Sequence, residues 1–263
     1  MELEHLLFSV EGGIARLRLN RPAALNALSR PLLGEMITVL DALPDMPEAR
    51  VLVISGEGKG FSSGADLSGG SSPAGSPGFD AGAVLEDYYN PLMERFFALP
   101  IPVVSAIHGP VVGAGCMIAL AADIVIAARS AYFLQAFVNI GLVPDAGSTW
   151  WLPRLIGPGR ALSMMMLGEK VPAQKAMDWG MVHDVVDDDV LQDIVAKLAE
   201  KFARGPTRAY GLIRRAVRSN LECGLTAALG NERRDQRIAG DSHDFLEGVN
   251  AFREKRKPEF TGR

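Results

Sequence analysis

The sequence predicts an α/β fold with a helical C-terminal region. Three short apolar runs, at residues 51–54, 103–107 and 123–127, have the composition of strands that are covered on both faces. Helical patterns separate these runs over the first two-thirds of the chain, as in repeated strand and helix units. From Gly159 onward the patterns are helical. The fold we expect is a strand-rich core with helices packed on its C-terminal side.

The first elements are a strand and an amphipathic helix. Residues 14–19 alternate apolar and polar side chains, as a half-buried strand does, and Arg21-Pro22 ends the run. Ser29 is placed to cap the helix that follows. Pro44 and Pro47 end this helix. Its apolar residues recur at helical spacing on one face, and they are Leu32, Leu33, Met36, Leu40 and Leu43.

Two helices alternate with the later strands. Their patterns cover residues 84–99 and 115–122. Residues 68–82 are rich in Gly, Ser and Pro, and this composition predicts a flexible loop.

The C-terminal third carries further helical patterns. The last helices bury little apolar surface by themselves, which favours contact between subunits. We therefore expect a core over residues 1–200 and a helical oligomerisation region over 201–263. The predicted helices cover residues 160–167, 173–179, 190–203, 206–220 and 225–256.

Composition excludes several classes of partner. The chain has 263 residues, 48% of them hydrophobic, and a net charge of -4, so it lacks the basic footprint of a nucleic-acid binder. The N-terminus is acidic where a secretory signal is basic, and the longest apolar stretch, residues 117–128, is too short to cross a bilayer. Two cysteines, Cys116 and Cys223, make no disulfide framework. We expect a cytoplasmic protein with no membrane contact.

Asp145 is the most informative residue, because it is the acid positioned to serve two glycine loops. The loops are residues 60–67 (Gly-Phe-Ser-Ser-Gly-Ala-Asp-Leu) and 108–115 (His-Gly-Pro-Val-Val-Gly-Ala-Gly). Glycine lets backbone N–H groups approach a ligand oxygen closely, and the amides of Ala65 and Ala114 can converge on one carbonyl. Such an oxyanion hole is worth about 3–4 kcal/mol per donor in acyl chemistry. One acid facing two amide donors indicates proton transfer rather than hydrolysis.

Two other interpretations of the loops compete with this one. Residues 60–64 match the G-x-S-x-G elbow of serine hydrolases, with His183 and His243 downstream. An elbow needs a strand that runs directly into a turn and a helix, whereas here the strand ends near Ser55 and Ala65 leads into a Ser-, Gly- and Pro-rich loop. In the second interpretation, both loops are simply tight turns.

Several of these segments resemble the crotonase (enoyl-CoA hydratase/isomerase) superfamily, nearly end to end and in the same order. They are Asn20-Arg21-Pro22, residues 63–67, His108-Gly109, Gly113-Ala114-Gly115 and Asp123-Ile124. The resemblance implies a spiral of β-β-α units with a helical trimerisation region that binds acyl-CoA thioesters. It also implies that the N–H groups of Ala65 and Ala114 hold the thioester oxygen, and that the assembly is a homotrimer or a dimer of trimers.

Hydratases of this superfamily use two glutamates to handle water, and this chain has Met117 and Phe137 at those positions. Neither side chain transfers a proton, so we expect hydration to fail. Further segments are similar to the ring-epoxide isomerases of phenylacetate degradation, which form an oxepin-CoA and also shift 3-enoyl-CoA double bonds to position 2. The resemblance makes Asp145 the catalytic acid. The segments are residues 89–92, 123–131, 136–137, 141–145, 150–154 and 247–262.

Asp145 also has a structural interpretation, because Pro-Asp-x-Gly is a common turn and Asp caps helices well. Apolar surroundings raise the pKa of a carboxyl group and capping lowers it, so burial decides between the two roles. A third use exists in aromatic acyl-CoA dehalogenases, where an aspartate attacks the ring and a histidine activates water. That histidine position falls on Asn90, which argues against dehalogenation.

The resemblance also assigns the groups that contact the CoA thioester. Lys255 matches a basic C-terminal position of the family that reaches the CoA phosphates, either within the subunit or across a subunit boundary. The alternative interpretation of Lys255 is that it belongs to a solvated basic tail. We expect no metal, no separate cofactor and an acyl-CoA substrate, since nothing here has metal-ligand spacing. The assigned substrate-binding residues are Ala24, Leu25, Ser63, Gly64, Asp66, Leu67, Gly113, Phe137 and Lys255.

Three functions remain open at this point. The leading one is an isomerase of acyl-CoA esters that acts on the ring epoxide, on 3-enoyl-CoA, or on both. A general enoyl-CoA hydratase/isomerase of fatty-acid degradation is the second. The third is a non-catalytic acyl-CoA binding protein, which is compatible with the apolar Met117 and Phe137 and which the presence of Asp145 argues against.

Overall fold

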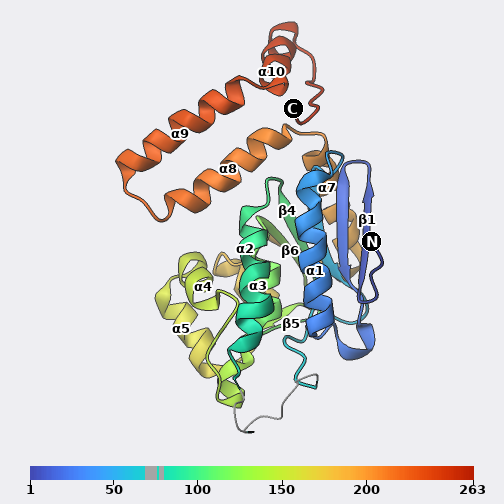
Figure 1. Ribbon diagram of the computed structural model, residues 1–263, viewed down its shortest axis with the longest axis vertical. Coiled ribbons are helices and arrows are strands. Elements are labelled where there is room, and N and C mark those ends of the chain that lie inside the picture. Colours follow the sequence, from blue (N-terminus) through green and yellow to red (C-terminus); the bar gives the residue numbers. More distant parts are fainter. Residues whose placement is uncertain (69–75, 77–79) are drawn as a thin grey trace.

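A computed structural model describes residues 1–68, 76 and 80–263 of the chain (Figure 1). The predicted loop at residues 68–82 lies largely outside these residues. The described part contains a six-stranded sheet, a three-stranded sheet and the helices that cover them.

The six-stranded sheet has the order β1-β2-β3-β4-β6-β9. Its first pair, β1 and β2, is antiparallel, and the remaining pairs are parallel. The predicted strand at 14–19 is confirmed without change, whereas the predicted strand at 123–127 begins one residue later. The strands are β1 (Leu6–Glu11), β2 (Ile14–Leu19), β3 (Val51–Gly56), β4 (Val103–Ile107), β6 (Ile124–Ala128) and β9 (Asp184–Val186).

The apolar strands of this sheet are covered on both faces, as their composition predicts. On one face, Val51 and Val53 pack with residues of α7 (Leu191–Ala203). On the other face, Leu52 and Ile54 join the main core.

A second sheet consists of β5 (Pro110–Val112), β7 (Tyr132–Leu134) and β8 (Val171–Pro172). Twice, a strand of the first sheet leads to a strand of the second and then to helical structure. The order is β4, β5 and α3 (Ala114–Leu120) in one case, and β6, β7 and the 3-10 helix η4 (Ala136–Ile140) in the other. Each such unit ends in backbone beside the second sheet, where the glycine loops lie.

The helices of the main core largely follow the predictions. α1 (Arg30–Ala42) begins at Ser29, whose hydroxyl accepts the N–H of Leu32 at 3.4 Å. The predicted helix at 84–99 is a π-helix, η3 (Leu85–Tyr89), that continues into α2 (Asn90–Ala98). The remaining helical elements of the described core are η1 (Pro22–Ala24), η2 (Leu43–Asp45), α4 (Ser148–Ile156), α5 (Pro158–Leu167), α6 (Ala173–Asp178) and η5 (Asp188–Val190).

The last helices extend away from the core at one end of the molecule (Figure 1). They are α8 (Thr207–Asn220), α9 (Leu225–Gly240) and α10 (His243–Glu254). The prediction of one helical segment over 225–256 is wrong, because the chain breaks at Asp241-Ser242. Ser242 has extended backbone and its hydroxyl accepts the N–H of Phe245 at 3.1 Å, which starts α10 as a new helix.

An ion cluster of two buried arginines and the partly exposed Asp123 attaches α8 to the core. Arg214 Nε lies 2.8 Å and Arg218 Nη2 lies 3.2 Å from the carboxylate of Asp123. Both guanidinium groups also donate to backbone carbonyls at the end of α2, including Phe96 O and Phe97 O. Asp123 meanwhile accepts the N–H of Val103 at 2.8 Å, which explains why β6 begins after it.

None of the described helices is long and apolar enough to cross a membrane. A stripe of exposed apolar side chains runs along α8 and the start of α9. Its residues lie four apart along α8, as on one face of a helix, and the same spacing recurs at the start of α9. Its members are Ile213, Val217, Leu221, Leu225 and Leu229, each more than half exposed.

Candidate active site

The first glycine loop is held in place by two neighbours. Ser62 N–H donates to Pro110 O at 3.0 Å and Val112 N–H donates to Ser62 O at 3.0 Å, so the loop pairs with β5. The buried amide of Asn26 donates to Gly60 O at 2.9 Å. The loop is therefore a fixed backbone surface.

The structure excludes Ser62 as a nucleophile of the hydrolase type. Its side chain is fully buried, and its hydroxyl donates to Asn26 O at 2.9 Å and accepts the N–H of Gly64 at 3.2 Å. The side chain of His183 is exposed, and its backbone N–H donates to Val125 O of β6. His243 contacts Thr261 and Asp244 near the C-terminus. Neither histidine has a contact with Ser62.

Glycines bring the two loops together. A Cβ at Gly64 would lie 2.9 Å from Val112 O, and a Cβ at Gly113 would lie 3.9 Å from the Cα of Gly64. Both glycines have positive φ, +89° and +54°. A side chain at Gly64 would push the two loops apart, so this position requires glycine.

The amides that the sequence singles out remain available in this arrangement. Ala65 forms a parallel bridge with Leu28, in which Leu28 N–H donates to Gly64 O and Asp66 N–H donates to Leu28 O. The N–H of Ala65 itself takes no part in this bridge and has no hydrogen bond in the described chain. Ala114 is the first residue of α3, and its N–H has no helical acceptor. Since Gly64 touches Gly113, two unpaired donors lie on adjoining loops.

Asp145 lies in a turn next to the second loop. The ring of Phe137 approaches the Cβ position of Gly113 to 3.7 Å, and the carbonyl of Phe137 accepts the N–H of Leu142. This contact ties the turn that contains Asp145 to the glycine loop.

Asp145 does not cap α4. Gly147, with φ of +81°, is the cap residue, and no side chain accepts from the first turn. The Oδ1 atom of Asp145 is buried without a hydrogen-bond partner in the described chain, and burial raises the pKa of its carboxyl group from 3.8 to about 6. The capping interpretation of this residue is therefore wrong, because the side chain is desolvated and does not bind the helix terminus.

The two positions that carry glutamates in hydratases are apolar and buried. Met117 lies one turn after Ala114 in α3, and Phe137 covers Gly113. Gln135 contacts Met117, with Nε2 at 3.9 Å from the sulfur, and its Oε1 atom is buried without a partner in the described chain. Nothing at these two positions exchanges protons.

The residues assigned to the pantetheine arm also gather at the first loop. Ser63 N–H donates to Leu25 O at 2.9 Å, and its hydroxyl donates to Ala24 O at 3.3 Å. Leu67 is largely exposed. Asp66 forms an ion pair with Arg21 at 2.8 Å, and its hydrogen bonds with Ser68 and Arg21 lower its pKa, so its carboxylate is occupied within the loop.

Lys255 lies far from this group within the chain. It is exposed at the end of α10, and α10 lies at one end of the molecule, away from β5 (Figure 1). The structure therefore does not bring Lys255 to the two loops of the same chain.

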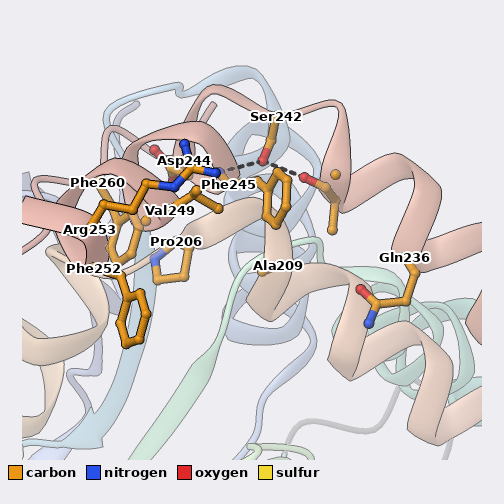
Figure 2. Close-up of a pocket in the computed structure, with 13 residues that line it drawn as sticks. Pro206, Ala209, Gln236, Ser242, Asp244, Phe245, Val249, Phe252, Arg253 and Phe260 are labelled. Carbon is orange, nitrogen blue, oxygen red and sulfur yellow. Dashed lines mark hydrogen bonds between the residues drawn. The ribbon is translucent and has the colours of Figure 1, made fainter.

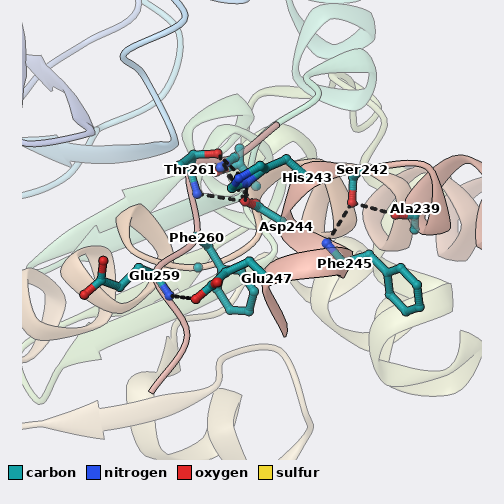
Figure 3. Close-up of polar contacts among 12 residues, drawn as sticks. Ala239, Ser242, His243, Asp244, Phe245, Glu247, Glu259, Phe260 and Thr261 are labelled. Carbon is teal, nitrogen blue, oxygen red and sulfur yellow. Dashed lines mark hydrogen bonds and ion pairs between the residues drawn. The ribbon is translucent and has the colours of Figure 1, made fainter. Parts of the chain in front are cut away.

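The C-terminal tail folds back along α10. Arg256 pairs with Glu247 at 2.6 Å, and the N–H of Gly262 donates to Asp244. Figure 3 shows the tail residues Thr261 and Glu259, whose N–H groups donate to Asp244 and Glu247. A cavity of about 790 Å³ lies between this tail and α8 to α10, lined by Phe245, Phe252 and Phe260 among others (Figure 2). This apolar cavity contains no part of the two glycine loops.

Three further residues complete the surroundings. His108 Nε2 contacts Gly58 O at 2.9 Å, in keeping with a structural role. Asn90, at the position where a dehalogenase has histidine, is exposed at the start of α2. The described residues contain no group of three metal-binding side chains.

Two residues of this site were not predicted from the sequence. Asn26 joins the N-terminal segment to the first loop through hydrogen bonds to Glu57 O and Gly60 O. Its φ is +54°, and asparagine adopts this conformation more readily than most residues, so the residue type itself was the available signal. Tyr89 is 2% exposed and is the last residue of the π-helix η3.

Comparison with known proteins supports a family assignment. The family model described as enoyl-CoA hydratase/isomerase matches residues 9–263. The chain is 42% identical to the 1,2-epoxyphenylacetyl-CoA isomerase of Escherichia coli over 261 residues, which cover 99% of this chain and all of the relative.

Hydratases are also among the similar proteins. The chain is 41% identical over 263 residues to a Rhodobacter capsulatus protein named "Probable enoyl-CoA hydratase", with full coverage of both. The crystal structure of an enoyl-CoA hydratase from Bacillus anthracis aligns with a TM-score of 0.91 and 32% identity, covering 99% of this chain and 100% of that one.

Proposed function

Because this chain belongs to the enoyl-CoA hydratase/isomerase family, we propose that it is an acyl-CoA isomerase with Asp145 as its single proton-transfer residue. Its fold is the α/β crotonase fold, with two mixed sheets and C-terminal helices. Within this family, the observation that carries the proposal is that Asp145 is half-buried, with its Oδ1 atom buried and unpartnered in the described chain, while Met117 and Phe137 are apolar and buried.

The proposed chemistry begins at the thioester. The N–H groups of Ala65 and Ala114 donate to the thioester oxygen and stabilise the enolate that forms when a proton leaves the adjacent carbon chain. Asp145 accepts that proton and returns it to a different carbon, so that a 3-enoyl ester becomes a 2-enoyl ester with no net change in atoms. A carboxyl group with a pKa of about 6 both takes and gives up a proton near neutral pH.

Ring-epoxide isomerisation is the physiological reaction that we propose. It is supported by the 42% identity to the 1,2-epoxyphenylacetyl-CoA isomerase over the full length of both chains. The same polarised thioester and the same acid serve an acyl group that carries a ring oxygen.

A general hydratase/isomerase of fatty-acid degradation is the competing function, and similarity to the R. capsulatus protein favours it. Hydration needs groups that activate and deliver water. Met117 and Phe137 supply none, which is why isomerisation is preferred here.

For substrate binding, we propose that Ala24, Leu25 and the backbone of Ser63 to Leu67 contact the pantetheine arm. Lys255 then reaches the CoA phosphates from a neighbouring subunit, because it ends α10, which lies at one end of the molecule away from β5 (Figure 1). The exposed apolar stripe on α8 and α9 provides surface for a homotrimer or a dimer of trimers, and residues 201–263 form that oligomerisation region.

The test compares two substrates. Purified protein is incubated with a 3-enoyl-CoA and with crotonyl-CoA, and conjugation and hydration are followed spectroscopically. We expect isomerisation without appreciable hydration, and a loss of about 10²- to 10⁴-fold in isomerisation for Asp145→Asn. Asp178→Asn is the matched control, since it removes an exposed carboxylate on α6.

Three outcomes contradict the proposal. Isomerisation that survives in Asp145→Asn removes Asp145 from the mechanism. Strong hydration by the native protein shows that Met117 and Phe137 do not prevent it. Tight binding of CoA esters without turnover of any substrate, the ring epoxide included, supports the third function, a non-catalytic acyl-CoA binding protein.

A further inference from the structure

The turn that contains Asp145 closes on a second polar residue, Ser148. Ser148 N–H donates to Asp145 O at 2.9 Å, and the two residues between them, Ala146 and Gly147, have positive φ of +49° and +81°. Positive φ at both central positions is the pattern of a type I′ turn, in which the first and fourth Cα atoms lie within about 7 Å of each other. Asp145 and Ser148 are therefore neighbours in space.

This turn keeps a buried alanine in an unfavourable backbone conformation. Ala146 is 3% exposed, and left-handed backbone brings its Cβ too close to the following carbonyl group. Such residues persist where the surrounding structure enforces them, often at functional sites. Here α4 is anchored by Trp151, whose Nε1 donates to Leu120 O of α3 at 2.8 Å, and by Leu152, which is fully buried in the main core one turn after Ser148. The packing of α4 therefore holds the turn in this form.

Each of the two side chains in this turn has a polar atom without a partner. Asp145 Oδ1 and Ser148 Oγ are both buried, and neither forms a hydrogen bond within the described residues. Ser148 is 0% exposed, so bulk water does not reach its hydroxyl group. Burying such atoms unpaired is unfavourable. The two atoms are also complementary, because a carboxylate oxygen accepts a hydrogen bond and a hydroxyl group donates one.

The carboxylate of Asp145 has two oxygen atoms in different surroundings. The residue is half-buried, and in the part of the chain that the structure describes Oδ1 is its one oxygen that is both covered and unpartnered. An acyl-CoA that fills the site displaces water from the carboxylate, and hydrogen bonds to the remaining donors strengthen in the drier surroundings. A donor at Oδ1 then matters most in the substrate complex.

We propose that Ser148 is a positioning residue of the isomerase, whose hydroxyl group donates a hydrogen bond to Asp145 Oδ1 in the substrate complex and so directs Oδ2 at the acyl chain. This inference rests on the proposed function and adds a second residue to it. Rotation about the single side-chain torsion of serine moves the hydroxyl group between staggered positions, so the backbone stays where it is. Ser148 keeps its proton throughout, and the proton transfer itself involves Asp145 alone.

The main experiment measures kcat and KM of Ser148→Ala on a linear 3-enoyl-CoA. We expect kcat to fall about 10-fold or more, because the lost hydrogen bond is made to a charged group. KM should change by less than about 2-fold, because Ser148 acts through Asp145 and not on the substrate. Ser148→Thr keeps the hydroxyl group and should restore kcat to within about 3-fold of the native value.

Ser105→Ala is the matched control. Ser105 on β4 is also 0% exposed, and its hydroxyl group likewise has no partner among the described residues. Its removal should leave kcat within about 2-fold of the native value. An unchanged kcat in Ser148→Ala, an equal loss in Ser105→Ala, or a folded Ser148→Thr that is as slow as Ser148→Ala overturns the positioning role.

The double variant Ser148→Ala with Asp145→Asn separates this inference from the proposed function. If Ser148 acts through the carboxylate, its removal lowers the residual kcat of Asp145→Asn by less than about 2-fold. A further loss as large as in the native background overturns the positioning role and leaves Asp145 as the proposed base. If Asp145→Asn by itself stays active, the proposed function fails, and the crystal structure described next decides whether the hydrogen bond exists.

A crystal structure of the native protein with phenylacetyl-CoA, an unreactive ester, tests the contact without any variant. We expect Ser148 Oγ at about 2.5–3.0 Å from Asp145 Oδ1, the normal range for a hydroxyl donor. A separation greater than about 3.5 Å in that complex overturns the inference.

Discussion

Asp145→Asn should make the protein more stable above pH 6 while it removes isomerase activity. Burial raises the pKa of this carboxyl group from 3.8 to about 6, and no hydrogen bond compensates its Oδ1 atom in the described chain. The folded state therefore holds the proton more tightly than the unfolded state does. A change of this size corresponds to about 3 kcal/mol, because one pKa unit is 1.36 kcal/mol.

The sign of the pH dependence follows from proton linkage. Below pH 3.8 both states carry the proton, and the Asp145 carboxyl group has no charge to desolvate. Between pH 3.8 and about 6 only the folded state carries it, so the free energy of unfolding falls as the pH rises. Above pH 6 the buried charge imposes its full penalty, and the neutral amide of the variant escapes it.

The assay is urea unfolding of the native protein and the variant at one protein concentration, at several values between pH 4.5 and 8. We expect the variant to gain up to about 3 kcal/mol at pH 8 and progressively less toward pH 4.5. In parallel, kcat/KM of the native enzyme should rise with pH and level off above an apparent pKa of about 6. A stability difference that does not change with pH, or a variant that is less stable at pH 8, refutes the desolvated carboxylate.

Three further predictions concern the loops and the attachment of the C-terminal helices. Gly64→Ala should cost more stability than Gly113→Ala, about 2–3 against about 1 kcal/mol in urea unfolding, because only the former meets a carbonyl oxygen at 2.9 Å; equal costs would show that the loops can separate. Arg214→Met should lower the free energy of unfolding by about 2–3 kcal/mol, since it removes the hydrogen bonds of a buried guanidinium group to Phe96 O and Leu99 O, whereas Arg154→Met should cost less than about 1 kcal/mol because its ion pair is exposed; similar costs for the two variants contradict this account. Ser62→Ala should retain isomerase activity within about 10-fold and lose about 1–2 kcal/mol of stability; complete inactivation of a folded variant would reopen a chemical role for the serine.

The strands and helices of the core were predicted where short-range pattern decides them. Residues 51–54 and 103–107 are apolar because both faces of the sheet are covered, and the pattern alone carries that information. β5 and β7 were not predicted, since strands of three residues have too little periodicity to stand out. The break between α9 and α10 was missed because the apolar spacing continues across Asp241-Ser242, and only the cap at Ser242 reveals it.

The candidate site shows the same division. The two glycine loops and Asp145 were identified from the order of residues, because their backbone needs are local. Tyr89 was not singled out, because a tyrosine in an apolar helix looks like any core residue. The expectation for Lys255 stays a proposal, since its reach depends on a second subunit.

The sequence by itself determined the family, the fold class and the residue types that limit the chemistry, because glycine, a lone acid and two missing glutamates are chemical facts that need no coordinates. Tertiary structure decided which of these residues share one site and in what state. The contact of Gly64 with Gly113 and the desolvation of Asp145 arise from packing between segments far apart in the chain. A pKa depends on what surrounds a carboxyl group in space, and folding alone supplies those surroundings.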